Sequence, residues 1–249
     1  MYYCCGITEK GVMPHNEDAM LIDGSVIEAG FHEHNTEAPF IAAVSDGVSG
    51  ERSGELASKM CLELISDIAY SSKVRLEQRL HGVHNQLVEY GSANPENHNM
   101  QATLCGFAVD ENGRILAFNV GDSRLYRFRE GRINQISRDQ SLVQLLYEEG
   151  TITLEQKRTH VHRNIIFPAL GNVTTKPKID IAPIDGGMEY GDVLLLCTDG
   201  LSDYVSSLDM EEVLELPKSL SDRLNMLVQK ALENGSEDNV TVIAVVYCG

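Results

Sequence analysis

Five aspartates lie where an apolar run of the chain meets a turn, and most have a glycine or an asparagine as a neighbour. They are Asp18, Asp46, Asp122, Asp199 and Asp238. A carboxylate at the end of a strand can point into a shared cleft while the strand fixes its backbone. Five such groups could bind hard divalent cations through oxygen alone. A single Asp-Gly after a strand is usually an ordinary turn, but five aspartates in one kind of context predict a metal-dependent enzyme.

The expected metal follows from the ligands in these five contexts. No histidine or cysteine stands directly beside any of the five aspartates, and carboxylate, carbonyl and water ligands suit Mg²⁺ or Mn²⁺ rather than zinc or copper. Two such ions about 3.5–4 Å apart are suited to phosphoryl hydrolysis, because they activate a water and neutralise charge on the phosphoryl oxygens. Crowded carboxylates repel one another, so we expect metal binding to stabilise the fold as well.

The elements that must position these aspartates can be predicted from the hydrophobic pattern. Apolar runs bounded by turns predict strands at residues 2–8, 19–23, 39–45, 103–109, 114–120, 124–127, 133–136, 176–181, 193–197 and 240–247. Helical spacing of apolar residues predicts helices at 53–69, 74–90, 142–149, around Leu154, at 210–214 and at 220–232. The polar stretches 24–38 and 91–99 are expected to be loops.

Hairpin turns dominate this order of elements. Asn112-Gly113 between two apolar runs is the strongest short hairpin signal in the chain. Because strands and helices do not alternate one-to-one, the pattern favours antiparallel sheets with helices packed outside, not a doubly wound parallel sheet. There is no internal repeat and no low-complexity linker, so residues 1–249 are expected to form a single domain.

Composition excludes several classes of partner. The chain has 20 Lys and Arg against 37 Asp and Glu, a formal net charge of −17, and no basic run, so neither nucleic acid nor an anionic membrane surface is expected to bind. The six cysteines contain no CxxC pair and are expected to be buried, reduced thiols. The sequence shows neither the pattern of a signal peptide nor an apolar run of about 20 residues, which predicts a soluble cytoplasmic protein.

Seven motifs, in order through almost the whole chain, resemble the metal-dependent protein phosphatases of type 2C, the PPM family, in their compact bacterial form. Each is weak alone, but their order and spacing together are typical of the family. They are Asn16-Glu17-Asp18-Ala19, Val44-Ser45-Asp46-Gly47-Val48-Ser49-Gly50, Gly54-Glu55-Leu56-Ala57-Ser58, Gly121-Asp122-Ser123-Arg124, Arg163-Asn164 to Ala169-Leu170-Gly171, Thr198-Asp199-Gly200-Leu201-Ser202-Asp203, and Glu237-Asp238-Asn239-Val240-Thr241.

The resemblance implies an α+β fold, a four-layer α-β-β-α sandwich of two antiparallel sheets flanked by helices. It implies hydrolysis of phosphoserine and phosphothreonine on proteins by a metal-activated water at a binuclear Mn²⁺ or Mg²⁺ centre, with a third ion possible. The expected partners are phosphoprotein substrates of a serine/threonine kinase in signal transduction, and the expected state is a monomer.

The resemblance also implies roles for individual residues. Asp46 would bridge both metals, and the carbonyl of Gly47 would bind one of them. Three carboxylates would hold the second ion, with Glu17 nearby: Asp18, Asp199 and Asp238. Asp122 would form the third, weaker site together with Asp199. The resemblance implies that the ligands of the first two ions are also the catalytic residues: Asp46, Asp18, Asp199 and Asp238. The segment 160–169 would lie near the mobile flap beside the active site.

Two positions depart from the family pattern. An arginine that grips the substrate phosphate in a bidentate fork usually stands where this chain has Met13, and a thioether cannot replace it. The sequence does not rank the cations that could take its place, which are Lys10, Arg52 and Arg163. Animal members also have a histidine where this chain has Val48.

Histidines near these motifs could protonate the leaving oxygen, although water could do so too. His15 is more simply an exposed turn residue, and His160 and His162 are ambiguous. Met13 also leaves open an alternative, a weak or inactive pseudophosphatase that acts as a regulatory domain; the full set of metal carboxylates argues against it. A calcium-binding module is disfavoured, because no EF-hand-like loop occurs.

Overall fold

Two six-stranded sheets, antiparallel throughout, form the centre of the protein. The computed structural model describes residues 1–48, 53–66 and 76–249. The first sheet has the order β4 (Gly30–Thr36), β1 (Tyr2–Glu9), β12 (Val240–Tyr247), β11 (Val193–Cys197), β8 (Arg124–Arg129) and β9 (Arg132–Gln135). The second has the order β10 (Asp180–Pro183), β7 (Ile115–Val120), β6 (Leu104–Val109), β5 (Phe40–Asp46), β2 (Asp18–Ile22) and β3 (Ser25–Ile27).

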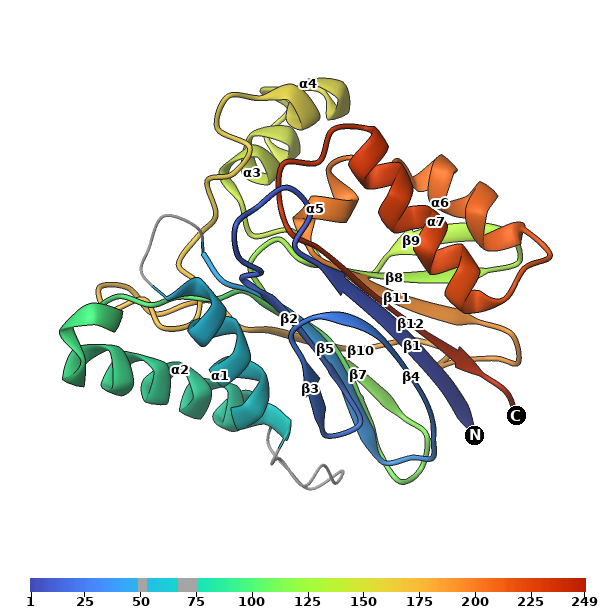
Figure 1. Ribbon diagram of the computed structural model, residues 1–249, viewed down its shortest axis with the longest axis horizontal. Coiled ribbons are helices and arrows are strands. Elements are labelled where there is room, and N and C mark those ends of the chain that lie inside the picture. Colours follow the sequence, from blue (N-terminus) through green and yellow to red (C-terminus); the bar gives the residue numbers. More distant parts are fainter. Residues whose placement is uncertain (49–52, 67–75) are drawn as a thin grey trace.

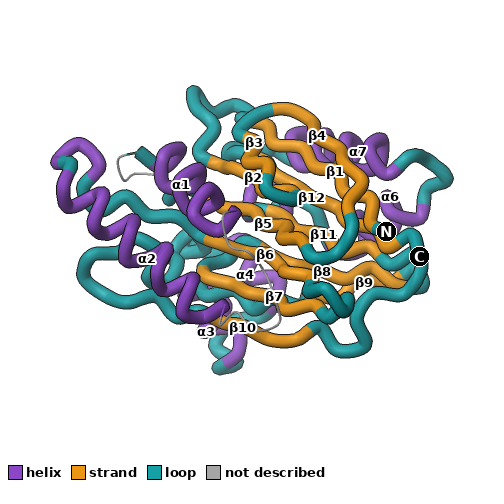
Figure 2. The backbone as a smooth tube through the Cα atoms, turned by 90° about the horizontal axis from the view of Figure 1, so that it is seen from below, coloured by secondary structure: helices purple, strands orange, loops and turns teal. Residues whose placement is uncertain are grey.

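Helices cover the outer face of each sheet (Figures 1 and 2). On the second sheet, α1 (Gly54–Ser66) packs on β2 and β5, and α2 (Leu76–Ala93) packs on α1. On the first sheet, α7 (Leu220–Glu233) packs on β1 and β12, and α6 (Ser207–Glu215) packs on β9. The predicted four-layer α-β-β-α sandwich is therefore confirmed.

The central strands are apolar on both faces because each sheet lies between two other layers. In β5, Ile41 and Ala43 pack under α1 and α2, while Phe40, Ala42 and Val44 pack between the sheets. This alternation is the two-residue period of a strand with both sides buried. It explains why continuous apolar runs, rather than alternating patterns, marked the core strands in the sequence.

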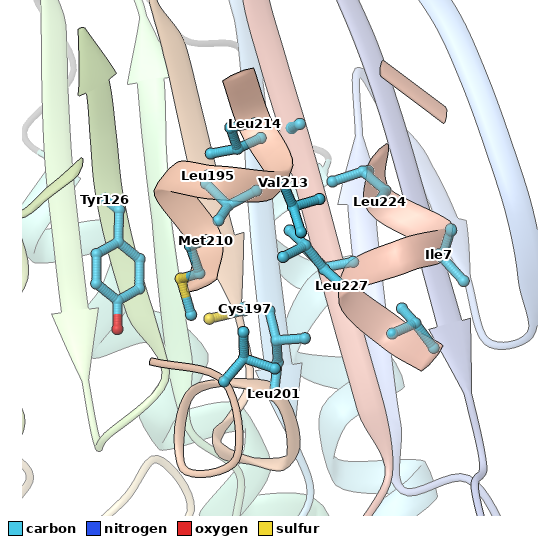
Figure 3. Packing of buried hydrophobic residues seen from close by; sticks show 14 of the residues in the cluster. Ile7, Tyr126, Leu195, Cys197, Leu201, Met210, Val213, Leu214, Leu224 and Leu227 are labelled. Atoms are coloured by element: carbon cyan, nitrogen blue, oxygen red, sulfur yellow. The ribbon is translucent and has the colours of Figure 1, made fainter. Parts of the chain in front are cut away.

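The layer between the first sheet and its helices is a third apolar cluster, shown in Figure 3. Leu195 and Cys197 of β11 face Met210 and Val213 of α6 and Leu227 of α7 across this cluster. All the cysteines are free, and five of the six are buried, as expected for thiols packed as small apolar groups.

Two shorter helices connect the sheets outside this core. They are α3 (Leu142–Glu148) and α4 (Leu154–Thr159), which contact each other and project beyond the ends of the strands near α5 (Asp199–Ser202) (Figure 1). The N- and C-termini lie at the opposite end of the strands, where Cys248 N donates a hydrogen bond to Met1 O (3.0 Å).

Some predicted boundaries were wrong. Residues 24–38 were expected to form a loop but contain β3 and the polar strand β4. β4 is an edge strand, so one face and one edge meet solvent, and its sequence therefore lacks the apolar signal of a core strand. Helix α2 runs to Ala93, into the second expected loop, and β10 begins at Asp180 rather than at residue 176. Residues 67–75, where two predicted helices meet, lie outside the described residues.

In the described part of the chain, no helix combines the length and the apolar character needed to cross a bilayer.

Candidate metal centre

Two of the five aspartates are brought together by the register of one strand pair. Asp18 is the first residue of β2 and Asp46 is the last residue of β5, and the antiparallel register pairs them directly. The carboxylate of Asp18 is buried and accepts a hydrogen bond from Thr198 Oγ1 (2.8 Å), which comes from the other sheet. This hydrogen bond ties the ends of the two sheets together at the site.

The strand pair β11–β12 places two more aspartates at the same end of the sandwich. Asp199 opens α5, separated from the end of β11 by Thr198 alone, and Asp238 comes two residues before the start of β12. The two chain segments pack closely, since a Cβ at Gly200 would stand 1.9 Å from the carbonyl oxygen of Asn239. Glycine is therefore required at position 200 for Asp199 and Asp238 to approach each other.

Asp122 joins these four from the connection between the two sheets. It lies between β7 of the second sheet and β8 of the first, directly after Gly121, whose φ is +105°. That backbone conformation favours glycine, and a Cβ there would also stand 2.7 Å from Thr103 Cγ2. The turn delivers the fifth carboxylate to the gap between the sheet ends.

The aspartates surround one cavity of about 150 Å³. Four of the five line it directly, and Asp18 is paired with one of them, Asp46, across β2 and β5. The lining residues are Asp46, Val48, Thr103, Asp122, Asn164, Ile166, Asp199 and Asp238. The sequence hypothesis required these side chains to meet, and the fold brings them to one place from both sheets.

Glu17 and Gly47 lie beside this cavity. Gly47 N donates to the carbonyl of Glu17 (3.0 Å), and Glu17 N donates to Asn239 Oδ1 (2.8 Å). A Cβ at Gly54 would stand 2.8 Å from Glu17 Oε1 and 3.1 Å from the carbonyl oxygen of Gly47. These two oxygens therefore lie against the start of α1, at the place that a side chain on residue 54 would fill.

Burial and mutual repulsion raise the pKa values of four carboxylates, those of Asp18, Asp46, Asp122 and Asp199. Burial is the largest cause for each of these four groups, and it raises the pKa of Asp18 and of Asp122 to about 7. The pKa of Asp46 is raised well above its ordinary range by burial and then by the charges of Asp18, Asp199, Asp238 and Asp122. Burial also raises the pKa of Asp199, and the charges of Asp122, Asp203, Asp238 and Asp18 raise it further. Such a cluster is costly as anions alone and calls for a compensating positive charge.

The donor atoms fit divalent cations. Asp199 Oδ1 is buried and has no hydrogen-bond partner, which is a rare state for a buried carboxylate oxygen. Oxygen ligands alone face the cavity, as Mg²⁺ and Mn²⁺ prefer. Among the described residues, no three His, Cys, Asp or Glu side chains already form a closed ligand set.

The candidates for gripping phosphate lie in different places. Met13 is half-buried in the turn after β1, where its N–H donates to the carbonyl of Lys10 (3.2 Å), and the Lys10 side chain is exposed. Arg163 lines a second cavity that shares Asp122 with the first. Arg52 lies outside the described residues. Val48 lines the aspartate cavity itself, at the position of the histidine in animal members.

The three candidate histidines are not among the residues that line the aspartate cavity. His15 is largely exposed and stands 3.9 Å from Glu55. His160 Nδ1 accepts a hydrogen bond from His162 N (3.1 Å), and the two rings lie 5.6 Å apart, tilted by 53°, on the segment after α4.

Three charged residues near Asp122 received no role from sequence reasoning. Asp139 accepts from Arg124 Nη2 and from Lys157 Nζ, both at 2.8 Å. Asp139 is buried, and these two cations hold its pKa below the ordinary value although burial acts in the opposite direction. Arg124 and Lys157 lie 15 and 18 positions from Asp139 in the sequence, so no local motif could have revealed this network.

Comparison with known proteins gives one consistent result. Residues 20–237 match the family model described as Protein phosphatase 2C. A serine/threonine phosphatase stp from Listeria welshimeri is 32% identical over 248 residues, which is 96% of this chain and 93% of that protein.

Solved structures agree with the fold. The serine/threonine phosphatase Stp1 from Staphylococcus aureus superposes with a TM-score of 0.84 at 30% identity, covering 100% of this chain and 96% of the other. The catalytic domain of the serine/threonine protein phosphatase PstP, solved in complex with two manganese ions, superposes with a TM-score of 0.79 at 26% identity, with full coverage of both chains.

Proposed function

The chain belongs to the protein phosphatase 2C family, and on that premise we propose that it is a metal-dependent phosphatase of phosphoserine and phosphothreonine in proteins. One observation carries the proposal: carboxylates from both sheets and from the connection between them line a single cavity, and one of their buried oxygens has no partner. The named relatives are serine/threonine phosphatases, and one was solved with two manganese ions.

The residues that would hold the cations are those inferred from the motifs. Asp46 lies opposite Asp18 and also interacts electrostatically with Asp199, Asp238 and Asp122, a position that suits a bridging ligand. The proposed ligands of the first two ions are Asp18, Asp46, Asp199, Asp238 and the Gly47 carbonyl, with Glu17 nearby. Asp122 would serve a third ion together with Asp199.

When bound, Mn²⁺ or Mg²⁺ would supply Lewis-acid chemistry, lowering the pKa of water and neutralising charge on the phosphoryl oxygens. The chain's own contribution is positioning. The Thr198 hydroxyl fixes the orientation of Asp18, and the N–H of Asn239 donates to Asp238 Oδ1 (2.8 Å), which fixes that carboxylate. Rigid strand ends therefore present the oxygens with little freedom left to lose.

The cellular setting is also part of the proposal. We propose that residues 1–249 form one phosphatase domain, since β1 and β12 pair along their whole lengths and join the two ends of the chain. Buried free thiols and the acidic composition support a monomeric cytoplasmic enzyme that acts on phosphoproteins, opposite a serine/threonine kinase in signal transduction.

Hydrolysis of a phosphothreonine peptide with Mn²⁺ tests the proposal. We expect turnover by the wild-type protein, loss with EDTA, and at least a roughly hundredfold fall in kcat for Asp46→Asn and Asp199→Asn, because each removes a charge that neutralises the cations. Asp185→Asn is the matched control, an exposed aspartate that does not line the cavity, and should leave the rate unchanged.

The same assay distinguishes the alternative. A wild-type protein whose melting temperature rises with Mn²⁺ but which releases no phosphate would be a pseudophosphatase. Full activity in Asp46→Asn would show that the aspartate cavity is not the site of hydrolysis.

A further inference from the structure

A second cavity, of about 230 Å³, lies directly beside the aspartate cavity. The two share Asp122, and the neighbouring residues Arg163 and Asn164 line one each. The second cavity is walled by the start of β8, the residues after α5, and α4. The lining side chains that bear charge are Asp122, Arg124, Asp139, Lys157, Arg158, Arg163 and Asp203. Any group held there would lie close to the proposed cations.

The buried charged side chains of this cavity form ion pairs with one another. Asp139 is bound by Arg124 and Lys157, and Asp203 Oδ1 stands 3.6 Å from Arg124 Nη2. The side chains of Arg124, Lys157 and Asp139 are 14%, 12% and 1% exposed, so this network is part of the cavity floor. It fixes the shape of the cavity but has little charge left for a ligand.

Two arginines at the cavity differ from that network. Within the described residues, neither Arg158 nor Arg163 forms an ion pair or a hydrogen bond through its guanidinium. Arg158 is exposed on α4, and Arg163 is half-buried and lies near enough to Asp203 to influence its charge. Both guanidinium groups line the same cavity, so they are available together to an anion that enters it.

We propose that Arg158, Arg163 and the cavity that they line form an arginine subsite, which binds an anionic side chain of the phosphoprotein substrate close to the phosphorylated residue. The anion would be a carboxylate or a second phosphate, both of which match the planar donor fork of arginine. This inference rests on the proposed function and specifies its substrate class: phosphorylated segments with a neighbouring negative charge.

The spacing of the two anions on the substrate follows from the shared wall. Because adjacent residues line the two cavities, an extended peptide at about 3.3–3.6 Å per residue would span from one to the other in roughly one to three residues. The chain has an overall negative charge, which disfavours the binding of acidic peptides. A preference for an acidic peptide would therefore indicate a local cationic site.

The test compares phosphothreonine peptides in an otherwise neutral sequence. One series carries a single glutamate at each position from three before to three after the phosphothreonine, and a second series carries phosphoserine at the same positions. The quantity measured is kcat/KM for phosphothreonine hydrolysis, relative to the neutral phosphopeptide. We expect one or two positions to raise this ratio about five- to tenfold, an effect that falls with added salt.

Variants assign the effect to the subsite. Arg158→Ala and Arg163→Ala should each reduce the acidic-to-neutral ratio, and the double variant should bring it close to one. Arg79→Ala is the matched control, because Arg79 is an exposed arginine of α2 that lines neither cavity, and its ratio should equal that of the wild type.

Each outcome has a defined meaning. A gain with glutamate identifies a carboxylate as a sufficient anion, and a gain only in the phosphoserine series identifies a second phosphate. Equal rates for all peptides, or a preference that survives in the double variant, would overturn the arginine subsite. Neither result contradicts the proposed phosphatase function. That function fails only if the neutral phosphopeptide itself is not hydrolysed.

Discussion

At the scale of single residues, Asp46 and Met13 represent the two halves of a phosphatase site. Asp46 lies at a strand end, faces Asp18 across a strand pair, and interacts with the charge of every other aspartate in the cavity. Met13 lies in a turn and presents a thioether where the family resemblance implies an arginine. The half of the site that would bind cations therefore has all its expected carboxylates, while the half that would bind phosphate lacks its expected charge.

Met13→Arg should improve substrate binding if no other residue grips the phosphate. A bidentate guanidinium contact would lower KM for a phosphopeptide about three- to tenfold with little change in kcat, because it would act on the ground state and the transition state alike. Steady-state kinetics with the neutral phosphothreonine peptide measure this.

Two further variants separate charge from geometry. Met13→Lys supplies a charge without the planar fork and should give a smaller gain, while Met13→Leu keeps the volume and should give none. An unaltered KM in Met13→Arg would mean that another cation already supplies the phosphate contact.

At the scale of elements, α4 is held to the body of the protein mainly by polar contacts. It has six residues, none of them buried, so apolar packing contributes little to its position. Thr153 and Gln156 form a capping box at its start. Lys157 donates to Asp139 Oδ2 (2.8 Å) and to Gln144 Oε1 (2.5 Å), which joins α4 to α3 and to the loop before it.

Lys157→Met should therefore loosen α4 selectively. The variant removes both hydrogen bonds but leaves Asp139 paired with Arg124, so we expect global stability to fall by about 1–3 kcal/mol. Amide hydrogen exchange in Leu154–Thr159 should accelerate more than exchange in the core strands.

The neighbouring arginine provides the comparison for that experiment. Arg158→Met removes the same charge from the same helix without breaking an ion pair, and it should leave the exchange of α4 close to that of the wild type. If both variants loosen α4 equally, helix charge rather than the Lys157 contacts holds it in place.

At the scale of the whole molecule, the acidic cavity lies where the ends of both sheets meet. The carboxylates are fixed by the same strand pairs that build the core, so their repulsion acts against the assembled sandwich. A cation that binds them only in the folded state shifts the folding equilibrium toward that state.

We therefore expect Mn²⁺ to stabilise the protein in a pH-dependent way. At about 100 times its dissociation constant, a single ion adds about 2.7 kcal/mol, or roughly 5–10 °C in Tm for a chain of this size. The pKa values of Asp18 and Asp122 are raised to about 7, so their contribution to stability without metal is present below about pH 4 and is lost as the pH rises through about 7. The Mn²⁺ shift should then be larger at pH 8 than at pH 5.5, as measured by calorimetry.

Asp46→Asn is the informative variant for this prediction. It removes a buried, repelled charge, so the metal-free variant should melt above the metal-free wild type at pH 8, while its gain from Mn²⁺ should shrink. Potassium at equal ionic strength is the control and should not reproduce the Mn²⁺ shift. A wild-type Tm that does not respond to Mn²⁺ at any pH would contradict the cation site.

The sequence by itself determined the core and the candidate site residues. Strands such as β5 and β11 are apolar on consecutive residues, and the aspartates stand at the chain positions where such runs end, so local pattern was sufficient to find both. The edge strand β4 and the extent of α2 were not predictable in this way. A polar edge strand has no apolar period, and a helix end is set by its neighbours as much as by its own residues.

Only the tertiary structure decided which residues meet. The convergence of Asp46, Asp122, Asp199 and Asp238 depends on strand register and on the crossing between the sheets, which no local pattern encodes. The pairing of Asp139 with Arg124 and Lys157, and the uncommitted guanidinium groups beside it, also depend on segments that are distant in sequence. Local pattern can identify residues suited to binding a metal, but only the three-dimensional arrangement determines which charges are balanced and which remain available for a substrate.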